Sequence, residues 1–295
     1  PGPSVIGEAM DAIAAGRHVM IFSDNVPVEH EIVLKDAAAA AGVLVMGPDC
    51  GTALIGGVGL GFANVLRAAG SRSDTPSVGV IAASGTGAQQ LTCLLDQAGV
   101  PISAVLGLGG RDLSEKVGGR SALAALTMLE DDPATDHIVI VSKPPHPATA
   151  EKVIAAATAS AKPVTTVLLG RGQPDLTSAA ESVLRSIHVP VPTWPYWSPD
   201  DGIHPVAGAL RGLYSGGTLA DEAMIIAGDI LGDIRSNIPL APELALPASA
   251  TGHGLPKLGG LGHVIVDLGD DEFTRGRPHP MIDPTVKLDL LAAQA

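Results

Sequence analysis

One continuous segment, residues 78–97, reads VGVIAASGTGAQQLTCLLDQ. Its first part is a short apolar run of strand length, and its second part, from Gly85 to Gln97, has the length and composition of a helix. The turn between them is Ser84-Gly85-Thr86-Gly87. A buried strand that turns directly into a helix is the unit from which parallel α/β sheets are built. The segment therefore predicts an α/β fold.

Strands and helices alternate on both sides of this segment. We expect strands at 19–23, 43–46, 102–106, 138–141 and 164–169, and helices at 7–15, 29–41, 121–129 and 150–161. Hydrophobic residues make up 46% of the chain and aromatic residues only 2%. The core must therefore consist of aliphatic side chains, as in layered proteins with buried parallel strands.

The chain also contains an internal repeat. In the first copy the Ser84 turn opens a helix, and a later strand runs into GLGGRD at 107–112. In the second copy Ser215-Gly216-Gly217-Thr218 opens a helix, and a strand at 264–266 runs into DLGDD at 267–271. The order of parts is the same, with an insertion at 234–262 in the second copy.

The repeat divides the chain into three predicted segments, 1–70, 77–188 and 200–295, with a Pro-rich linker at 189–199. The first segment lacks the initial strand and Gly-rich loop of a complete nucleotide-binding domain. The last one stops about one strand-helix unit short of a full copy. We therefore expect a partial first domain and an incomplete third one.

Both Gly-rich turns are predicted to bind anions. A strand that passes through such a turn into a helix presents unpaired N–H groups at the positive end of the helix dipole. Glycine lets a ligand approach the backbone, and the hydroxyl groups add donors. The binding residues would be Ser84, Gly85, Thr86, Gly87, Ser215, Gly216, Gly217 and Thr218. The alternative for each turn is an ordinary helix cap, but two copies in equivalent places favour binding.

Further candidates follow the ends of predicted strands. Arg111 could orient a carboxylate or phosphate, or could form an ion pair with Asp112 or Glu115. Lys143 could bind substrate or simply be exposed. Candidate substrate-binding residues are Gly109, Gly110, Arg111, Lys143, Asp270, Asp271 and Arg277, and candidate catalytic residues are Arg111, Arg277 and His279.

The last two of these lie in a rigid Pro-rich stretch, 275–284, which suits a binding loop. The alternative is a connector in which Asp283 caps the final helix, and the binding loop is preferred. Cys50 could be a nucleophile, but the neighbouring Asp49 disfavours a thiolate, so a packed loop cysteine is the preferred interpretation.

Composition argues against several classes of protein. The formal charge of −13 disfavours nucleic-acid binding, because phosphate backbones require clustered Lys and Arg. Apolar runs stay below the roughly 18 residues of a membrane span, and the chain begins without a signal-peptide pattern. Two cysteines fit a reducing, cytoplasmic setting. The nine histidines form no spaced ligand set, so no metal is predicted.

The motifs together resemble the FdrA family, relatives of the α subunit of succinyl-CoA synthetase. The resemblance spans nearly the whole chain in order. It rests on residues 22–26 (FSDNV), 46–52 (MGPDCGT), 84–87 (SGTG), 107–113 (GLGGRDL), 142–145 (SKPP), 212–219 (GLYSGGTL), 265–271 (IVDLGDD) and 276–284.

The resemblance implies a fold and a chemistry. Residues 1–70 would be part of a Rossmann-like CoA-binding domain, and 77–188 and 200–295 would be tandem flavodoxin-like domains of the synthetase type. The synthetase carries a phosphohistidine, in a Gly-His-Ala-Gly segment, between two helix N-termini. Here the corresponding position, after the strand at 164–169, reads GRGQ at 170–173 and has no histidine.

That departure makes ATP-driven thioester formation by the same route an alternative rather than the leading hypothesis. FdrA proteins are also linked to oxamate carbamoyltransferase in allantoin breakdown, which needs a phosphate site but no covalent histidine. Our leading hypothesis is a subunit of a carbamoyl- or acyl-transferring enzyme that binds phosphate, acyl phosphate or carbamoyl phosphate between the two turns. Arg111 or Arg277 would orient a small anionic substrate.

Other enzyme subunits are expected as partners, and a homo-oligomer is possible. The first alternative is an acyl-CoA synthetase that uses CoA and a nucleotide. The second is a non-catalytic scaffold that binds metabolites.

Overall fold

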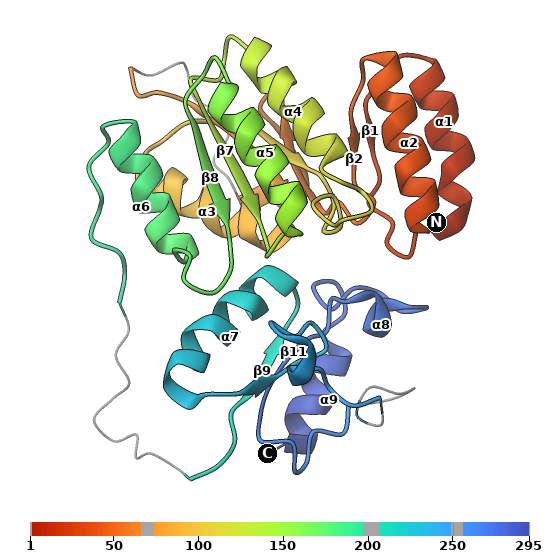
Figure 1. The fold of residues 1–295 in the computed structure, drawn as a ribbon, viewed down its shortest axis with the longest axis vertical. Coiled ribbons are helices and arrows are strands. Elements are labelled where there is room, and N and C mark those ends of the chain that lie inside the picture. The colour runs from red at the N-terminus through yellow and green to blue at the C-terminus, as the bar shows by residue number, and fades with distance from the viewer. Residues whose placement is uncertain (1, 66–73, 197–206, 249, 251–255, 295) are drawn as a thin grey trace. The chain divides into compact units, whose positions relative to one another are not determined.

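The computed structural model describes residues 2–65, 74–196, 207–248, 250 and 256–294. The chain divides into two compact units, which we call unit 1 (Pro1–Val189) and unit 2 (Pro190–Ala295). Helices and predominantly parallel strands alternate along both units (Figure 1). The predicted α/β class is therefore confirmed.

Unit 1 is built on a mixed sheet of six strands in the order β4-β3-β6-β5-β7-β8. The strands are β3 (Thr52–Ile55), β4 (Val58–Gly61), β5 (Val78–Ala83), β6 (Ile102–Gly107), β7 (His137–Ser142) and β8 (Val164–Leu168). Strands β5 to β8 are parallel, whereas β3 runs antiparallel to both β4 and β6. Every residue of β5 and β7 is buried, as expected for central strands of a parallel sheet.

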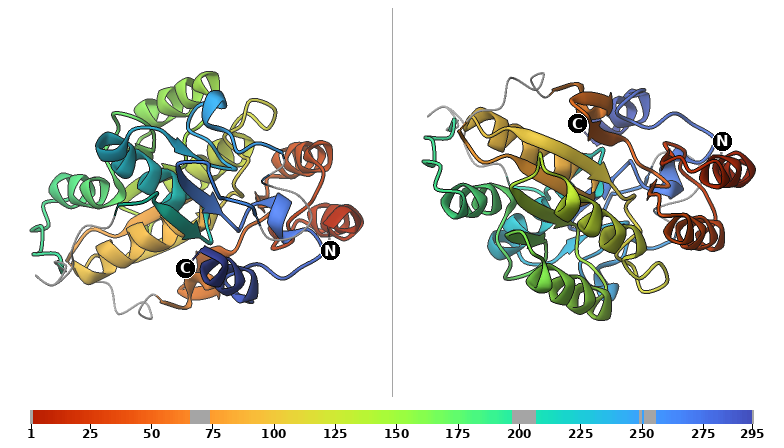
Figure 2. Two further views of the ribbon diagram at one scale, coloured as in Figure 1. Left: turned by 90° about the horizontal axis from the view of Figure 1, so that it is seen from below. Right: turned by 90° about the horizontal axis from the view of Figure 1, so that it is seen from above.

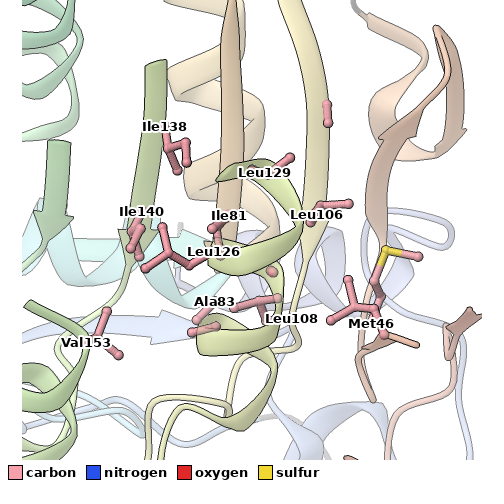
Figure 3. Close-up of a cluster of buried hydrophobic side chains, with 14 of the residues drawn as sticks. Met46, Ile81, Ala83, Leu106, Leu108, Leu126, Leu129, Ile138, Ile140 and Val153 are labelled. Atoms are coloured by element: carbon pink, nitrogen blue, oxygen red, sulfur yellow. The ribbon is translucent and has the colours of Figure 1, made fainter. Parts of the chain in front are cut away.

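Four helices cover this sheet: α3 (Gly85–Gln97), α4 (Arg120–Asp131), α5 (Pro147–Ala159) and α6 (Leu176–Ser186). Helix α3 packs against α6, and α4 packs against α5 on the opposite face (Figure 1). The core between the sheet and α4 and α5 is aliphatic. Figure 3 labels Met46, Ile81, Ala83, Leu106, Leu108, Leu126, Leu129, Ile138, Ile140 and Val153 in it.

The N-terminal part of unit 1 forms a second, smaller layer. It consists of a 3₁₀ turn (Gly2–Ser4), α1 (Val5–Ala14), β1 (Val19–Met20), α2 (Val28–Ala41) and β2 (Val45–Met46). Helices α1 and α2 lie side by side (Figure 2) and share a core with residues from β1 and β2. Both strands are shorter than predicted, because β1 and β2 pair through only two residues each.

Strands β3 and β4 form a hairpin that the sequence analysis did not anticipate, followed by a 3₁₀ turn (Phe62–Val65). Its two-residue loop is Gly56-Gly57, and both glycines have positive φ, as the favoured hairpin turns require. Because β3 pairs with β6, these residues join the six-stranded sheet although they lie within the predicted segment 1–70. The domain boundaries 1–70, 77–188 and 200–295 stay predictions.

Unit 2 has a parallel sheet of three strands in the order β10-β11-β9. Its elements are β9 (Arg211–Tyr214), α7 (Gly217–Leu231), β10 (Ile234–Arg235), a 3₁₀ turn (Pro242–Leu244), β11 (His263–Asp267), α8 (Asp271–Thr274) and α9 (Thr285–Gln294). The order β9-α7-β11 resembles β5-α3-β6, since a helix lies between two neighbouring parallel strands in the chain, but in unit 2 the insertion with β10 separates α7 from β11. Strand β10 belongs to the insertion in the second copy.

The predicted linker at 189–199 contains neither helix nor strand in its described part, 189–196. Within the described ranges, every helix is too short or too polar to traverse a bilayer.

Gly109 marks a close approach between the two layers of unit 1. It has φ +82°, and a Cβ atom there would lie 2.0 Å from the carbonyl oxygen of Pro48. The loop after β6 thus rests directly on the backbone of the loop after β2. Only glycine satisfies both the conformation and the contact.

We therefore expect Gly109→Ala to lower the free energy of unfolding by about 3 kcal/mol, from left-handed strain and overlap together. Gly172→Ala is the matched control, because Gly172 has φ +75° but no atom within 4 Å of an added Cβ. The Gly172→Ala substitution should lower the free energy of unfolding by only about 1 kcal/mol. Urea unfolding measures the free energy of unfolding of both variants. Equal decreases in the two variants would contradict the close contact at Gly109.

Candidate functional site

The carboxyl ends of β5 and β7 meet at the point where the order of strands reverses. From β5 the chain turns through α3 to β6 on one side, and from β7 it turns through α5 to β8 on the other. Ala83 pairs with Ser142, so Ser84 and Lys143 follow directly paired residues. Ligands of open α/β sheets bind at such switch points, which makes this edge the candidate site of unit 1.

The Ser84 turn opens α3 as predicted. The Ser84 hydroxyl accepts a hydrogen bond from the Gly87 N–H at 2.9 Å, so both residues take part in an N-cap. The N–H groups of Gly85 and Thr86 find no acceptor among the described residues. Gly85 is exposed, so these two donors at the positive helix end can reach a ligand.

Lys143 supplies a cation at the same edge. A Cβ atom added to Gly110 would lie 3.4 Å from its Nζ atom, which shows that the side chain reaches over the loop after β6. Because Lys143 follows β7, which pairs with β5, its ammonium lies at the same edge of the sheet as the Ser84 turn. Within the described part of the chain its ammonium has neither a hydrogen bond nor an ion pair.

Thr52 is a candidate that the sequence analysis missed. It lies at the start of β3 and is buried, and its Oγ1 atom would be 3.9 Å from a Cβ atom at Gly85. Gln89 of α3 donates its Nε2 to this hydroxyl at 3.0 Å. The hairpin therefore places a hydroxyl beside the Ser84 turn, and the Gly56-Gly57 pair was the sequence signal for that hairpin.

Arg111 is engaged with the N-terminal layer. Its Nη2 atom lies 3.1 Å from Glu31 Oε2 and donates to the Val26 carbonyl at 2.7 Å. An ion pair was one of the two interpretations of Arg111, but the observed partner is Glu31 rather than Asp112 or Glu115. The direct role of Arg111 in substrate binding stays a prediction.

The Ser215 turn of unit 2 differs from the Ser84 turn. Helix α7 begins after Gly216 and has no side-chain cap. The Ser215 Oγ atom is buried and finds no hydrogen-bond partner among the described residues. Thr218 is also buried. Sharing of one anion by the two turns stays a prediction.

Acidic residues follow β11, the neighbour of β9. Asp267 pairs with Tyr214, and its buried carboxylate accepts the Gly269 N–H at 2.9 Å. Asp270 caps the short helix α8, whose first residue is Asp271. The carboxyl edge of the sheet in unit 2 thus carries the carboxylates of Asp267 and Asp270, whereas that edge in unit 1 carries the ammonium of Lys143.

His279, in the Pro-rich stretch 275–284, lies next to Gly269 at the carboxyl end of β11. A Cβ atom at Gly269 would lie 2.7 Å from His279 Nε2 and 3.1 Å from Asp267 Oδ1, so the imidazole and the carboxylate border the same glycine. The His279 Nδ1 atom accepts the Met281 N–H at 3.2 Å, which leaves the proton of a neutral ring on Nε2. The side chain of Arg277 is exposed.

Asp283 accepts hydrogen bonds from the Thr285 N–H and hydroxyl at the start of α9, as its predicted capping role requires. These hydrogen bonds lower the pKa of its carboxyl. In the part of the chain that the structure describes, His, Cys, Asp and Glu form no group of three that could hold a metal ion.

The chain is similar in sequence to an uncharacterized bacterial protein and to subunits of succinate–CoA ligases. It matches no model of a known protein family. It is 39% identical over 307 residues to the uncharacterized protein YahF of Escherichia coli K12, across 98% of this chain and 57% of YahF. It is 28% identical over 145 residues to the α subunit 2 of an ADP-forming succinate–CoA ligase of Archaeoglobus fulgidus, across 48% of this chain and 47% of that subunit.

The dinucleotide-forming acetyl-coenzyme A synthetase 1 of Ca. Korarchaeum cryptofilum, solved with phosphate and ADP, aligns with a TM-score of 0.40. Its sequence is 20% identical, across 64% of this chain and 39% of the synthetase.

The fold and the two edges define an α/β protein in which strands turn directly into helices at their carboxyl ends. The chain is a homologue of YahF and a distant homologue of succinate–CoA ligase α subunits. It spans about half the length of these relatives.

Cys50 gives a prediction about reactivity. Burial is the main cause that raises the pKa of its thiol to about 11, and the nearby Asp49 charge contributes to that rise. The pKa of Cys93, which is half-buried, is also raised by burial. At pH 8, iodoacetamide should therefore alkylate Cys93 slowly and Cys50 only after unfolding, as measured by peptide mass spectrometry. Equal rates for the two cysteines in the folded protein would favour Cys50 as a nucleophile.

Proposed function

We propose that the chain forms part of an acid–thiol ligase of the succinate–CoA ligase type and binds a phosphoryl group at the Ser84 turn. The observation that carries the proposal is that the Gly85 and Thr86 N–H groups and the Lys143 ammonium, at the ends of two paired strands, have no partner among the described residues. Two aligned donors at a helix N-terminus and one cation match the shape and charge of a phosphate. The similarity to succinate–CoA ligase α subunits supports the ligase class.

The proposed reaction joins a carboxylic acid to the thiol of CoA through an acyl phosphate. The thiol sulfur attacks the acyl carbon, the bond from that carbon to the phosphate oxygen breaks, and the thiol proton passes to the released phosphate. Negative charge grows on the leaving phosphate during this step. Gly85, Thr86 and Lys143 would stabilise it there.

The acyl phosphate in this proposal is a diffusible molecule. The segment Gly170-Arg171-Gly172-Gln173 follows β8 and offers no histidine to carry the phosphate covalently. A nucleotide would serve to form the acyl phosphate, and the N-terminal layer with β1 and β2 would contribute to CoA binding. Membership of the FdrA family is part of the proposal, supported by the ordered motifs along the chain.

Carbamoyl transfer would use the same phosphate site, because carbamoyl phosphate and acyl phosphate share their anionic end. The similarity to succinate–CoA ligase α subunits favours the ligase and gives that reaction no support. Additional subunits and self-association stay predictions.

The test is thioester formation by the purified protein, alone and with candidate partner subunits. CoA and acetyl phosphate are supplied, and loss of free thiol is followed. Lys143→Met should lower the rate about a hundredfold, because one stabilising group of the transition state is lost. Lys152→Met, which removes an exposed lysine from α5, should leave the rate unchanged.

Two outcomes would count against the proposal, one against the Ser84 site and one against the ligase. One is thioester formation at an unchanged rate in Lys143→Met. This result would mean that the Ser84 turn and Lys143 take no part in the reaction. The other is phosphate-dependent release of oxamate from oxalurate without any thioester formation, which would establish carbamoyl transfer instead.

A further inference from the structure

The loop after β6, residues 107–112, is held by four charged side chains that we call the buried ion cluster: Glu31, Lys35, Arg111 and Asp112. Lys35 of α2 is only 3% exposed. Its ammonium donates to Glu31 Oε1 at 2.7 Å, to Asp112 Oδ1 at 2.8 Å and to the Leu108 carbonyl at 3.1 Å. All three of its protons are thus used, so Lys35 is a structural cation.

Asp112 connects the cluster to α4. It is fully buried, and its two carboxylate oxygens accept the N–H groups of Ser121 at 3.1 Å and Ala122 at 3.0 Å. The residue before α4 is Gly119, which has no side chain to cap the helix. Asp112 therefore supplies the missing cap from the loop, while it also binds Lys35.

Arg111 closes the cluster on its outer side. Glu31 is 1% exposed, and its Oε2 atom faces the Arg111 guanidinium at 3.1 Å. Arg111 also binds the Val26 carbonyl in the loop after β1. Two acids and two bases make the cluster electrically neutral, which a buried group of charges requires.

The loop that the cluster holds also contacts the candidate site. Gly109 rests on the Pro48 carbonyl, and the Lys143 side chain lies against Gly110. A shift of residues 107–112 would therefore move the surface on which the Lys143 ammonium rests. No member of the cluster needs to touch the anion for this effect to occur.

We propose that the buried ion cluster positions Lys143 for anion binding at the Ser84 turn, with Arg111 as a positioning residue rather than a ligand. This inference rests on the proposed phosphate site. It assigns Arg111 a role different from the substrate contact that its sequence position suggests.

Arg111 is the member to replace. Its side chain is 39% exposed, whereas Glu31, Lys35 and Asp112 are almost fully buried. Removal of a buried partner would leave an unpaired charge and could prevent folding. Arg111→Met removes the outer ion pair together with the hydrogen bond to the Val26 carbonyl, and Arg111→Lys keeps a positive charge near Glu31.

The experiment is a double-mutant cycle on inorganic phosphate affinity, measured by titration calorimetry of the full chain. It compares Arg111→Met, Lys143→Met and the double variant with the unchanged protein. Each single variant should weaken binding about tenfold, because small displacements of a binding group cost this much or more. The double variant should bind no more weakly than Lys143→Met alone, since Arg111 acts only through Lys143.

Two further variants separate positioning from general stability. Arg111→Lys should recover part of the affinity. Arg120→Met removes another ion pair between α4 and α2, with Asp36, at 2.6 Å, and should leave phosphate affinity unchanged. Additive losses in the cycle, or wild-type affinity in Arg111→Met, would overturn the proposal.

If the unchanged protein binds no phosphate, the proposed function fails at the Ser84 site. The positioning role is then decided by hydrogen exchange of residues 107–112. Faster exchange in Arg111→Met than in Arg120→Met supports control of this loop by the cluster, and equal exchange overturns it.

Discussion

The ammonium of Lys35 is the interaction on which much of unit 1 depends. A charge that is 3% exposed is tolerated only when it is paired, and its acceptors come from α2 and from the loop after β6. Through Asp112 the same pairing reaches the first turn of α4. Loss of one partner of such a pair costs about 3–5 kcal/mol, so these elements have little freedom to move separately. The N-terminal layer and the six-stranded sheet are thereby fixed at the loop that borders the candidate site.

The two repeated turns share a backbone design and differ in their electrostatic surroundings. At the Ser84 turn, the hydroxyl caps α3, two N–H groups have no acceptor among the described residues, and Lys143 adds positive charge at the same sheet edge. At the Ser215 turn, the neighbouring strand ends in the buried carboxylate of Asp267. A helix N-terminus attracts anions, but an adjacent carboxylate opposes them. We therefore expect the first turn to be the stronger anion site, whereas His279 and Asp267 border the same glycine, Gly269, near the second turn.

The sequence predicts local structure best where several signals agree. Helix α3 was predicted from Gly85 to Gln97 and occupies those residues, because a buried strand, a Ser cap and a helical composition coincide. The hairpin at 52–61 was missed, since its strands are short and rich in glycine, although its Gly56-Gly57 turn was visible. Ser84 and Lys143 could be found from their places at strand ends. Lys35 could not, because its partners Leu108 and Asp112 lie 73 and 77 residues away and a lone lysine on a helix is usually solvated. Long-range pairing of charges leaves no periodic signal in a single sequence.

The central claim is that the start of α3 holds a phosphoryl group through its backbone. Amide NMR of the isotopically labelled protein during a titration with inorganic phosphate tests it most directly, because each N–H group reports its own contacts. The account predicts that the Gly85 and Thr86 amide signals shift together and reach saturation, while the capped Gly87 amide changes less. Unchanged Gly85 and Thr86 signals throughout the titration, whatever happens elsewhere in the spectrum, would contradict the account.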